Sequence, residues 1–224
     1  MVIKAEHRPR PGEPILGGTF LRKPGGEGAN KAVASERLGG QVSFICKTGS
    51  DIFGHQSQQL FEEEGIDTSY IFSDSKNQSG VALITVDEQA ENCIVVASGA
   101  NANLTPDDLA SAGDIIDRVD LILMQLEIPI ATVEYVAGQA YKKNKKVILN
   151  PAPAHPLSPS LLQHLYIITP NETEAEMISG IKIPNRETAE KAAKGITERG
   201  VQNVINPLGS RGALVYCRPE MEMI

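Results

Sequence analysis

From about residue 100 onward, short apolar runs alternate with segments that have the periodicity of amphipathic helices. The apolar runs are LILMQL (121–126), KVILN (146–150), YIIT (166–169) and NVIN (203–206). Helical patterns lie between them at 129–144, in ETEAEMIS and in RETAEKAAKGITERG. Short continuous apolar runs are typical of strands buried on both faces, and strands that alternate with helices form parallel, right-handed crossovers. We therefore expect an α/β fold with a doubly wound, mostly parallel sheet.

The first part of the chain has a different pattern, in which several strands follow one another without intervening helices. Strands are expected at 14–24, 80–86 and 92–98, and the DEQAE segment between the last two is short enough for a hairpin. Helices are expected at 29–38 and about 55–64. A few antiparallel strands beside a parallel sheet indicate a β flap over the strand ends, where open α/β sheets bind ligands.

Composition disfavours several classes of function. The net charge is −7 and no basic face is evident, which disfavours nucleic-acid binding. No apolar run approaches the ~18 residues of a membrane span, and the N-terminus lacks the hydrophobic region of a signal peptide. The three cysteines are far apart and form no CxxC pair, which argues against a disulfide framework. We therefore expect a cytoplasmic protein without membrane or nucleic-acid partners.

The segment GGEGANKAV (25–33) places three glycines in four residues directly ahead of an alanine-rich run. Such a loop lets a phosphate, a sugar or another helix approach the backbone closely. Glu27 carries a negative charge, which is unfavourable in a loop that binds an anion. The segment is not a GxGxxG sequence and no strand runs directly into it, so a dinucleotide site is disfavoured.

Two segments that follow strands allow either a structural or a phosphate-binding interpretation. In TPNETEAE (169–176), Asn171 can be the N-cap with Glu174 at N3, which forms a capping box. The same helix N-terminus can bind an anion, and its carboxylates can hold Mg²⁺. LGSRG (208–212) can be a simple hairpin turn into ALVYC or a turn that exposes amides to a ligand. Glu127 ends the run LILMQLE and is expected to point into the crevice at the strand ends.

Eight segments, in order, resemble the ribokinase branch of the PfkB sugar kinase family. They are PGEPILGGTF, PGGEGANKAVASERLGG, FICKTGSDIFG, SGVALITVDEQAENCIVVASGAN, LMQLEIP, LNPAPA, ITPNETEAE and LGSRG. The resemblance implies one PfkB-type kinase domain over 1–224, with lid segments at about 12–24 and 79–98. It also implies ATP-dependent phosphorylation of a pentose, with D-ribose to D-ribose 5-phosphate favoured and deoxyribose and related pentoses left open.

The resemblance also implies roles for individual residues. The residues that would contact the sugar are Gly25, Gly26, Gly28, Asn30 and Glu127. The residues that would bind the nucleotide are Asn171, Gly209, Ser210, Arg211 and Gly212, while Glu174 would serve the metal. ATP and Mg²⁺ are the implied cofactors. Because the lid of this family often pairs two subunits, a homodimer through the lid is also expected.

Three positions depart from the family pattern. Glu27 and Lys31 stand where the family loop has lysine and glutamine, and an i,i+4 ion pair between them is expected to neutralise Glu27 in part. Pro207 stands where ribokinases usually have threonine, and it removes a hydroxyl and a backbone donor.

Two elements of the family are not matched within these residues. The family's first central strand, with its sugar-binding aspartate, would precede residue 1. The general-base aspartate of its G-[AS]-G-D motif would lie beyond Ile224, together with the segments that form its monovalent-cation site. We therefore expect an incomplete kinase domain with no catalytic residue of its own and weak or absent turnover. The alternative is a non-catalytic module that binds sugar or nucleotide or pairs subunits.

Overall fold

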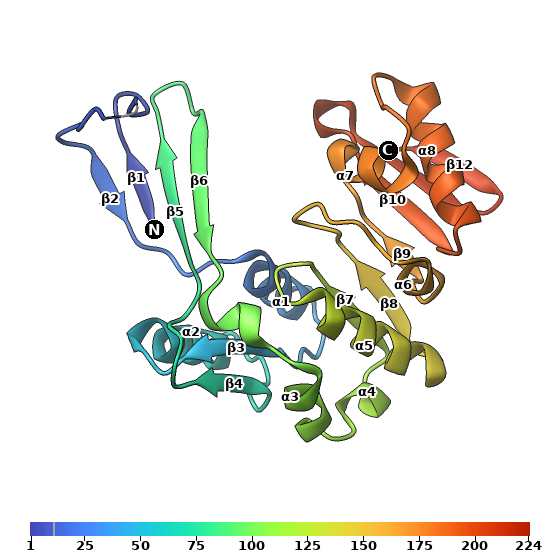
Figure 1. The fold of residues 1–224 in the computed structure, drawn as a ribbon, viewed down its shortest axis with the longest axis horizontal. Coiled ribbons are helices and arrows are strands. Elements are labelled where there is room, and N and C mark those ends of the chain that lie inside the picture. The colour runs from blue at the N-terminus through green and yellow to red at the C-terminus, as the bar shows by residue number, and fades with distance from the viewer. Residues whose placement is uncertain (11) are drawn as a thin grey trace. The chain divides into compact units, whose positions relative to one another are not determined.

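The computed structural model describes residues 1–10 and 12–224, which form two compact units, Met1–Leu104 and Thr105–Ile224 (Figure 1). Both units mix helices and strands, so the predicted α/β class and the predicted β lid are confirmed. The proposal of one kinase domain over the whole chain stays a prediction. No helix in the described part of the chain is both long and apolar enough to cross a bilayer.

The first unit contains a four-stranded sheet, which we call the lid sheet (Figure 1). Its strands, in spatial order, are β2 (Thr19–Leu21), β1 (Val2–Lys4), β5 (Val81–Val86) and β6 (Asn92–Ala97). β5 and β6 form the predicted antiparallel hairpin. Asp87 closes its turn, because the carboxylate accepts hydrogen bonds from the amides of Gln89 and Glu91 at 3.1 and 2.9 Å.

The strand predicted at 14–24 is shorter in the structure, where only Thr19–Leu21 pairs. Gly17 and Gly18 precede it with φ of 103° and 97°, values that take the backbone out of the extended region. A Cβ on Gly18 would lie 2.3 Å from the Lys4 carbonyl oxygen, so the chain turns closely against β1 here. The sequence also gave no indication of β1, which pairs in parallel with β5.

The rest of the first unit is a small α/β layer. Its elements are α1 (Glu27–Arg37), β3 (Cys46–Gly49), α2 (Ile52–Glu63), β4 (Ile71–Asp74) and the 3-10 helix η1 (Gly99–Asn103). β3 and β4 form a parallel pair that was not predicted, whereas α1 and α2 confirm the two predicted helices within a few residues. The core of this layer consists of Ala32, Phe61 and Ile66, and Phe44 packs edge-on against Phe61 at 5.0 Å.

Asp51 joins this layer to the base of the lid sheet. Its carboxylate caps α2 by accepting from the Gly54 amide at 2.9 Å, and it also accepts from the amide and hydroxyl of Ser79, both at 2.8 Å. Ser79 lies two residues before β5, and its hydroxyl oxygen accepts from the Gly49 amide at the end of β3, at 3.0 Å. One carboxylate thus fixes where the chain leaves the layer and enters the lid sheet.

The second unit contains a six-stranded sheet in the order β12–β11–β10–β9–β8–β7 (Figure 1). Its strands are β7 (Leu121–Met124), β8 (Lys146–Leu149), β9 (Ile167–Ile168), β10 (Asn203–Pro207), β11 (Ala213–Cys217) and β12 (Glu220–Met223). Its helices are α3 (Pro106–Ser111), α4 (Ile115–Arg118), α5 (Ile130–Lys142), α6 (Pro159–Gln163), α7 (Glu172–Ser179) and α8 (Arg186–Glu198). The four predicted strands β7 to β10 run parallel as expected. β11 pairs antiparallel with β10, and β12 pairs antiparallel with β11.

The strand register aligns one buried row of side chains across this sheet. The row runs through Met124, Leu149, Ile168 and Val204, and Leu214 is buried on the same face of β11, opposite Asn206. α5 packs on β8, and both α7 and α8 pack on β10. On the other face of β7, Leu121 and Leu123 are partly exposed. The parallel strands therefore present the carboxyl ends of β7 to β10 along one edge.

We expect Asp51→Asn to destabilise the first unit by about 1–3 kcal/mol at pH 7, because an amide cannot replace every hydrogen bond that the carboxylate accepts. Burial acts to raise the pKa of Asp51, but hydrogen bonds from Gly54 and Ser79 outweigh it and hold that pKa below its ordinary value. A lowered pKa means that the ionised form stabilises the fold at neutral pH and that this contribution disappears as the pH falls below about 4.

Urea unfolding at a series of pH values measures the difference between the parent and Asp51→Asn. The difference should be largest at pH 7 and should shrink below about pH 4. Glu88→Gln, which neutralises an exposed carboxylate in the lid hairpin, is the matched control and should change stability little. A difference between parent and Asp51→Asn that does not depend on pH would contradict this role.

Candidate functional site

The glycine-rich segment forms the N-terminus of α1. Gly26 is the N-cap, with φ 111° and ψ 142°, and its carbonyl accepts a hydrogen bond from the Asn30 amide at 2.9 Å. A positive φ of this kind requires glycine, whereas a Cβ at either Gly25 or Gly26 would meet no atom within 4 Å. The glycines therefore do not serve close packing against another helix. They leave an open helix N-terminus, with Asn30 exposed one turn along it and Gly28 partly buried between them.

Glu27 is compatible with this position because it lies in the first turn of α1, where a negative charge is favourable for the helix dipole. Its carboxylate also pairs with the Lys31 ammonium at 3.4 Å, which confirms the expected i,i+4 ion pair. The departure from the family loop therefore has a local structural explanation.

Glu127 does not lie at the end of its strand as expected. β7 ends at Met124, and Glu127 is a half-buried residue in the loop that leads to α5. The Leu126 amide in this loop donates to the Ala152 carbonyl at 2.8 Å, which ties the loop to the segment that follows β8. Glu127 belongs to the second unit and the glycine-rich segment to the first, so their convergence on one sugar stays a prediction.

Asn171 and Glu174 form the predicted capping box at the start of α7. The Glu174 amide donates to Asn171 Oδ1 at 2.9 Å, and the Asn171 amide donates to Glu174 Oε2 at 2.8 Å. The Asn171 side-chain amide also donates to Glu174 Oε1, at 2.9 Å. The structural interpretation is thus confirmed, and it leaves the metal role open.

The Glu174 carboxylate fits an outer-sphere role toward Mg²⁺. The residue is only 5% exposed, and its carboxylate oxygens accept hydrogen bonds from the backbone and side-chain amides of Asn171. A carboxylate oxygen can accept more than one hydrogen bond. Mg²⁺ in nucleotide sites usually keeps several waters and takes one or two carboxylates. Within residues 1–10 and 12–224, no group of three or more histidine, cysteine or acidic side chains forms a metal cluster.

The LGSRG segment is the turn of a hairpin between β10 and β11, as the structural interpretation proposed. Gly212 has a φ of 88°, and a Cβ there would lie 2.0 Å from the Ile224 carbonyl oxygen, so glycine is required. Gly209 also has a positive φ, of 58°, and both it and Ser210 are exposed. The Arg211 guanidinium forms an ion pair with the Glu172 carboxylate in the first turn of α7. The structure therefore brings together the two segments that the resemblance assigns to the nucleotide.

Asn206 is a residue of this region that sequence reasoning missed. It lies in β10, its side chain is 2% exposed, and its amide donates to the Pro170 carbonyl at 2.6 Å, just before the capping box. The available signal was a polar residue inside the apolar run NVIN, which continuous burial on both faces does not explain.

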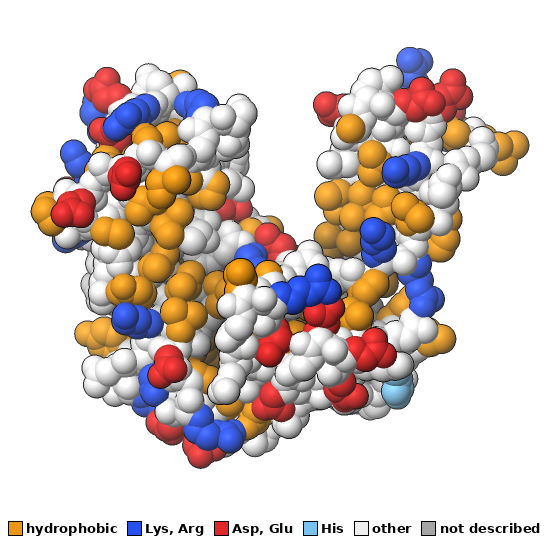
Figure 2. Space-filling model, turned by 180° about the vertical axis from the view of Figure 1, so that it is seen from behind, with side chains coloured by type: hydrophobic (Ala, Val, Ile, Leu, Met, Phe, Trp, Pro, Cys, Tyr) orange, Lys and Arg blue, Asp and Glu red, His pale blue; other side chains and the backbone are white. Residues whose placement is uncertain are grey.

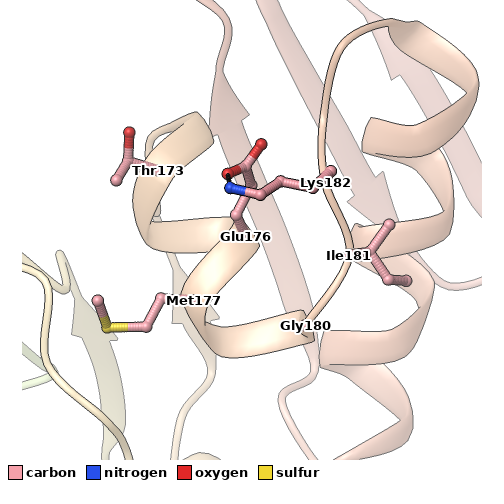
Figure 3. Close-up of a pocket in the computed structure, with 6 residues that line it drawn as sticks. All are labelled: Thr173, Glu176, Met177, Gly180, Ile181 and Lys182. Atoms are coloured by element: carbon pink, nitrogen blue, oxygen red, sulfur yellow. Dashed lines mark hydrogen bonds and ion pairs between the residues drawn. The ribbon is translucent and has the colours of Figure 1, made fainter.

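A shallow depression of about 310 Å³ lies on the outer side of α7 (Figure 3). It is lined by Thr173, Glu176, Met177, Gly180, Ile181 and Lys182, and the Glu176 carboxylate pairs with the Lys182 ammonium at 2.7 Å. None of the residues predicted to bind sugar, nucleotide or metal lines it. The depression therefore is a surface feature separate from the predicted site.

Comparison with known proteins agrees with these features. A family model described as pfkB family carbohydrate kinase matches residues 1–221. A ribokinase from Haemophilus influenzae is 43% identical over 223 residues, which cover 100% of this chain and 73% of that protein. A deoxyribokinase from Salmonella typhi is 33% identical over 221 residues, which cover 98% of this chain and 72% of that protein.

A solved structure gives the same relationship. The structure of Arabidopsis thaliana ribokinase complexed with ribose and ATP is similar with a TM-score of 0.85 and 27% identity, over 100% of this chain and 73% of that one. The family model and the relatives thus agree over essentially the whole sequence. The chain belongs to the pfkB family of carbohydrate kinases.

Proposed function

We propose that this chain acts in the ATP-dependent phosphorylation of D-ribose to D-ribose 5-phosphate. The observation that carries the proposal is the contact between the LGSRG turn and the N-terminus of α7, made by Arg211 and Glu172. Two segments that the resemblance assigns to one nucleotide are distant in sequence and adjacent in space. The ribokinase relative, at 43% identity, favours ribose, whereas the deoxyribokinase relative keeps deoxyribose open.

The residues proposed for the nucleotide and those proposed for the sugar each have a chemical role that they can perform. The N-terminus of α7 attracts phosphate oxygens through its dipole, and Glu174 holds waters of a bound Mg²⁺. Magnesium would supply charge neutralisation for the transferring phosphoryl group. Gly25, Gly26 and Asn30 offer amide groups to sugar hydroxyls at the open end of α1. The proposed role of the Glu127 carboxylate is to accept hydrogen bonds from hydroxyls of the sugar. We place this activity in the cytoplasm, because all three cysteines are free thiols.

Ribose and MgATP should each stabilise the chain. Ligand at about 100 times its Kd adds about 2.7 kcal/mol, which corresponds to roughly 5–10 °C for a chain of this size. Asn30→Leu and Glu127→Gln should abolish the shift with ribose and keep the shift with MgATP, as measured by thermal denaturation. Gln58→Leu changes an exposed amide on α2 and serves as the control. Retention of the full ribose shift in both site variants would contradict the assigned sugar residues.

Turnover by these residues alone should be slow. Residues 1–224 contain no G-[AS]-G-D sequence, to which the resemblance assigns the anion hole and the general base. Anion-hole donors contribute about 10²–10³ in rate and a general base about 10²–10⁴. A polypeptide of these residues should therefore react at least ~10⁴-fold more slowly than ordinary sugar kinases. A coupled ADP-release assay with ribose and MgATP measures this, and turnover at an ordinary rate would refute it.

We also propose that two copies of the chain pair through the lid sheet. All four of its strands expose an apolar side chain on the same face, and we call this set the lid patch: Ile3, Phe20, Leu83 and Val95. In Figure 2, hydrophobic side chains are exposed on the lid sheet. Exposed apolar side chains that extend across a whole sheet are typical of interaction surfaces, and the resemblance implies a second copy as the occupant.

Neighbouring residues on β6 offer a matched test of this pairing. Val95 is 62% exposed on the lid patch, and Ile94 is 52% exposed on the opposite face. Val95→Lys should raise the dimer dissociation constant by about tenfold or more, because a charge would be buried in the interface, whereas Ile94→Lys should change it little. Sedimentation velocity over a concentration series measures both. A monomeric parent, or equal effects of the two variants, would exclude the lid patch.

A further inference from the structure

Asn206 is a polar residue in a position where the sheet otherwise places apolar side chains. It lies opposite Leu214 on β11 and shares a face of β10 with Val204. The same buried row continues through Ile168, Leu149 and Met124. Burying an amide among apolar groups costs free energy unless hydrogen bonds compensate, so the residue needs a specific explanation.

Only half of the Asn206 amide is satisfied. Its Nδ2 donates to the Pro170 carbonyl at 2.6 Å, while Oδ1 has no hydrogen-bond donor among the described residues. Rotating the amide by 180° would place Oδ1 against the Pro170 carbonyl oxygen, where two acceptors would repel. The Pro170 carbonyl therefore fixes the orientation of the Asn206 amide, because it needs a donor. In this orientation Oδ1 is left without a hydrogen bond, which is unfavourable.

The missing backbone donor at this point is that of Pro207. In the parallel pairing of β9 with β10, the Tyr166 carbonyl accepts from the Asn203 amide at 3.0 Å. Four residues further along both strands, the same pattern would join the Pro170 carbonyl to the amide of residue 207. Proline has no N–H, so this ladder hydrogen bond cannot form. The side chain of Asn206 donates in its place.

The carbonyl that Asn206 holds belongs to the residue directly before the capping box. Pro170 precedes Asn171, the N-cap of α7, and α7 begins at Glu172. At the surface, Arg211 of the LGSRG turn pairs with Glu172. Two contacts thus join this end of the sheet to the start of α7: the buried amide of Asn206 in β10 and the exposed ion pair of Arg211 in the turn after β10.

We propose that Asn206 is a positioning residue for the nucleotide site, and that it replaces the backbone donor which Pro207 removes. Its amide sets the position of the α7 N-terminus relative to the LGSRG turn. The inference rests on the proposed function, because that function assigns both segments to ATP. Because Asn206 is buried, the proposed role acts through the position of α7 and needs no contact between Asn206 and the nucleotide.

The chain supplies a matched control at the other end of the same strand. The Asn203 side-chain amide also donates to a carbonyl across the strand pair, that of Tyr166, at 3.0 Å. This carbonyl keeps its backbone donor, the Asn203 amide, when the side chain is removed. Asn203→Val therefore deletes the same kind of hydrogen bond without leaving the carbonyl unpaired and without touching the start of α7.

Isothermal titration with MgATP compares Asn206→Val, Asn203→Val and the parent. Asn206→Val should raise the Kd for MgATP about tenfold, whereas Asn203→Val should stay within about twofold. Pro207→Thr restores a backbone N–H, so the double variant Asn206→Val/Pro207→Thr should bind within about threefold of Pro207→Thr alone. Equal effects of the two valine variants, or no rescue by Pro207→Thr, would overturn the proposal.

Amide hydrogen exchange separates this inference from the proposed function. If the parent does not bind MgATP, the proposed function fails, but the exchange of the Asn171 and Glu174 amides still tests the positioning. It should be about tenfold faster in Asn206→Val than in Asn203→Val, and equal rates would overturn the inference. If Asn206→Val does not fold, a folded double variant supports the replacement of the donor, and an unfolded one overturns it.

Discussion

The structure depends on holding the carboxyl ends of adjacent parallel strands together after their backbone ladders have ended. β9 pairs with its neighbours β8 and β10 over only two residues each, so other contacts must hold the segments that follow these strands. The Leu126 amide binds the Ala152 carbonyl, and the Asn150 side chain binds the Thr169 carbonyl at 3.2 Å. Asn206 extends the series to Pro170. Loops at this edge are therefore fixed to one another, and phosphoryl transfer in carbohydrate kinases relies on positioning of this kind.

Two of the buried polar residues in the second unit, Glu174 and Asn206, lie where this edge meets α7. Glu174 accepts hydrogen bonds from Asn171, and Asn206 donates one to Pro170, so both hold the residues that lead into α7. An apolar residue at 206 would suit the sheet better, since the Asn206 oxygen is unpaired. Proteins tolerate such local conflicts mainly at functional sites, where geometry matters more than stability. Because Pro207 has no backbone N–H, the proposed replacement donor is the side chain of Asn206, a polar residue at a buried position.

In the first unit, the main structural requirement is to attach the lid sheet to the α/β layer. Asp51 does this with one carboxylate that caps α2 and holds Ser79 before β5. The glycine-rich segment in the same unit shows how one sequence feature can have two explanations. Gly26 is needed for its backbone conformation, and the open space around it is also what a sugar requires. The negative charge of Glu27 would be unfavourable in a loop that binds an anion. Here it is stabilised by the helix dipole and by the ion pair with Lys31.

The sequence by itself determined the features that arise from neighbouring residues. Periodicity identified the four parallel strands and the helices α1, α2, α5, α7 and α8, and spacing identified the Asn171–Glu174 capping box. It failed for β1, whose three residues carry no periodic signal and are extended because they pair with β2 and β5. Only the tertiary structure decided the pairing of Arg211 with Glu172 and of Asn206 with Pro170, because these contacts join residues 39 and 36 positions apart. Strand register sets such contacts, and register follows from the packing of the whole sheet rather than from any local pattern.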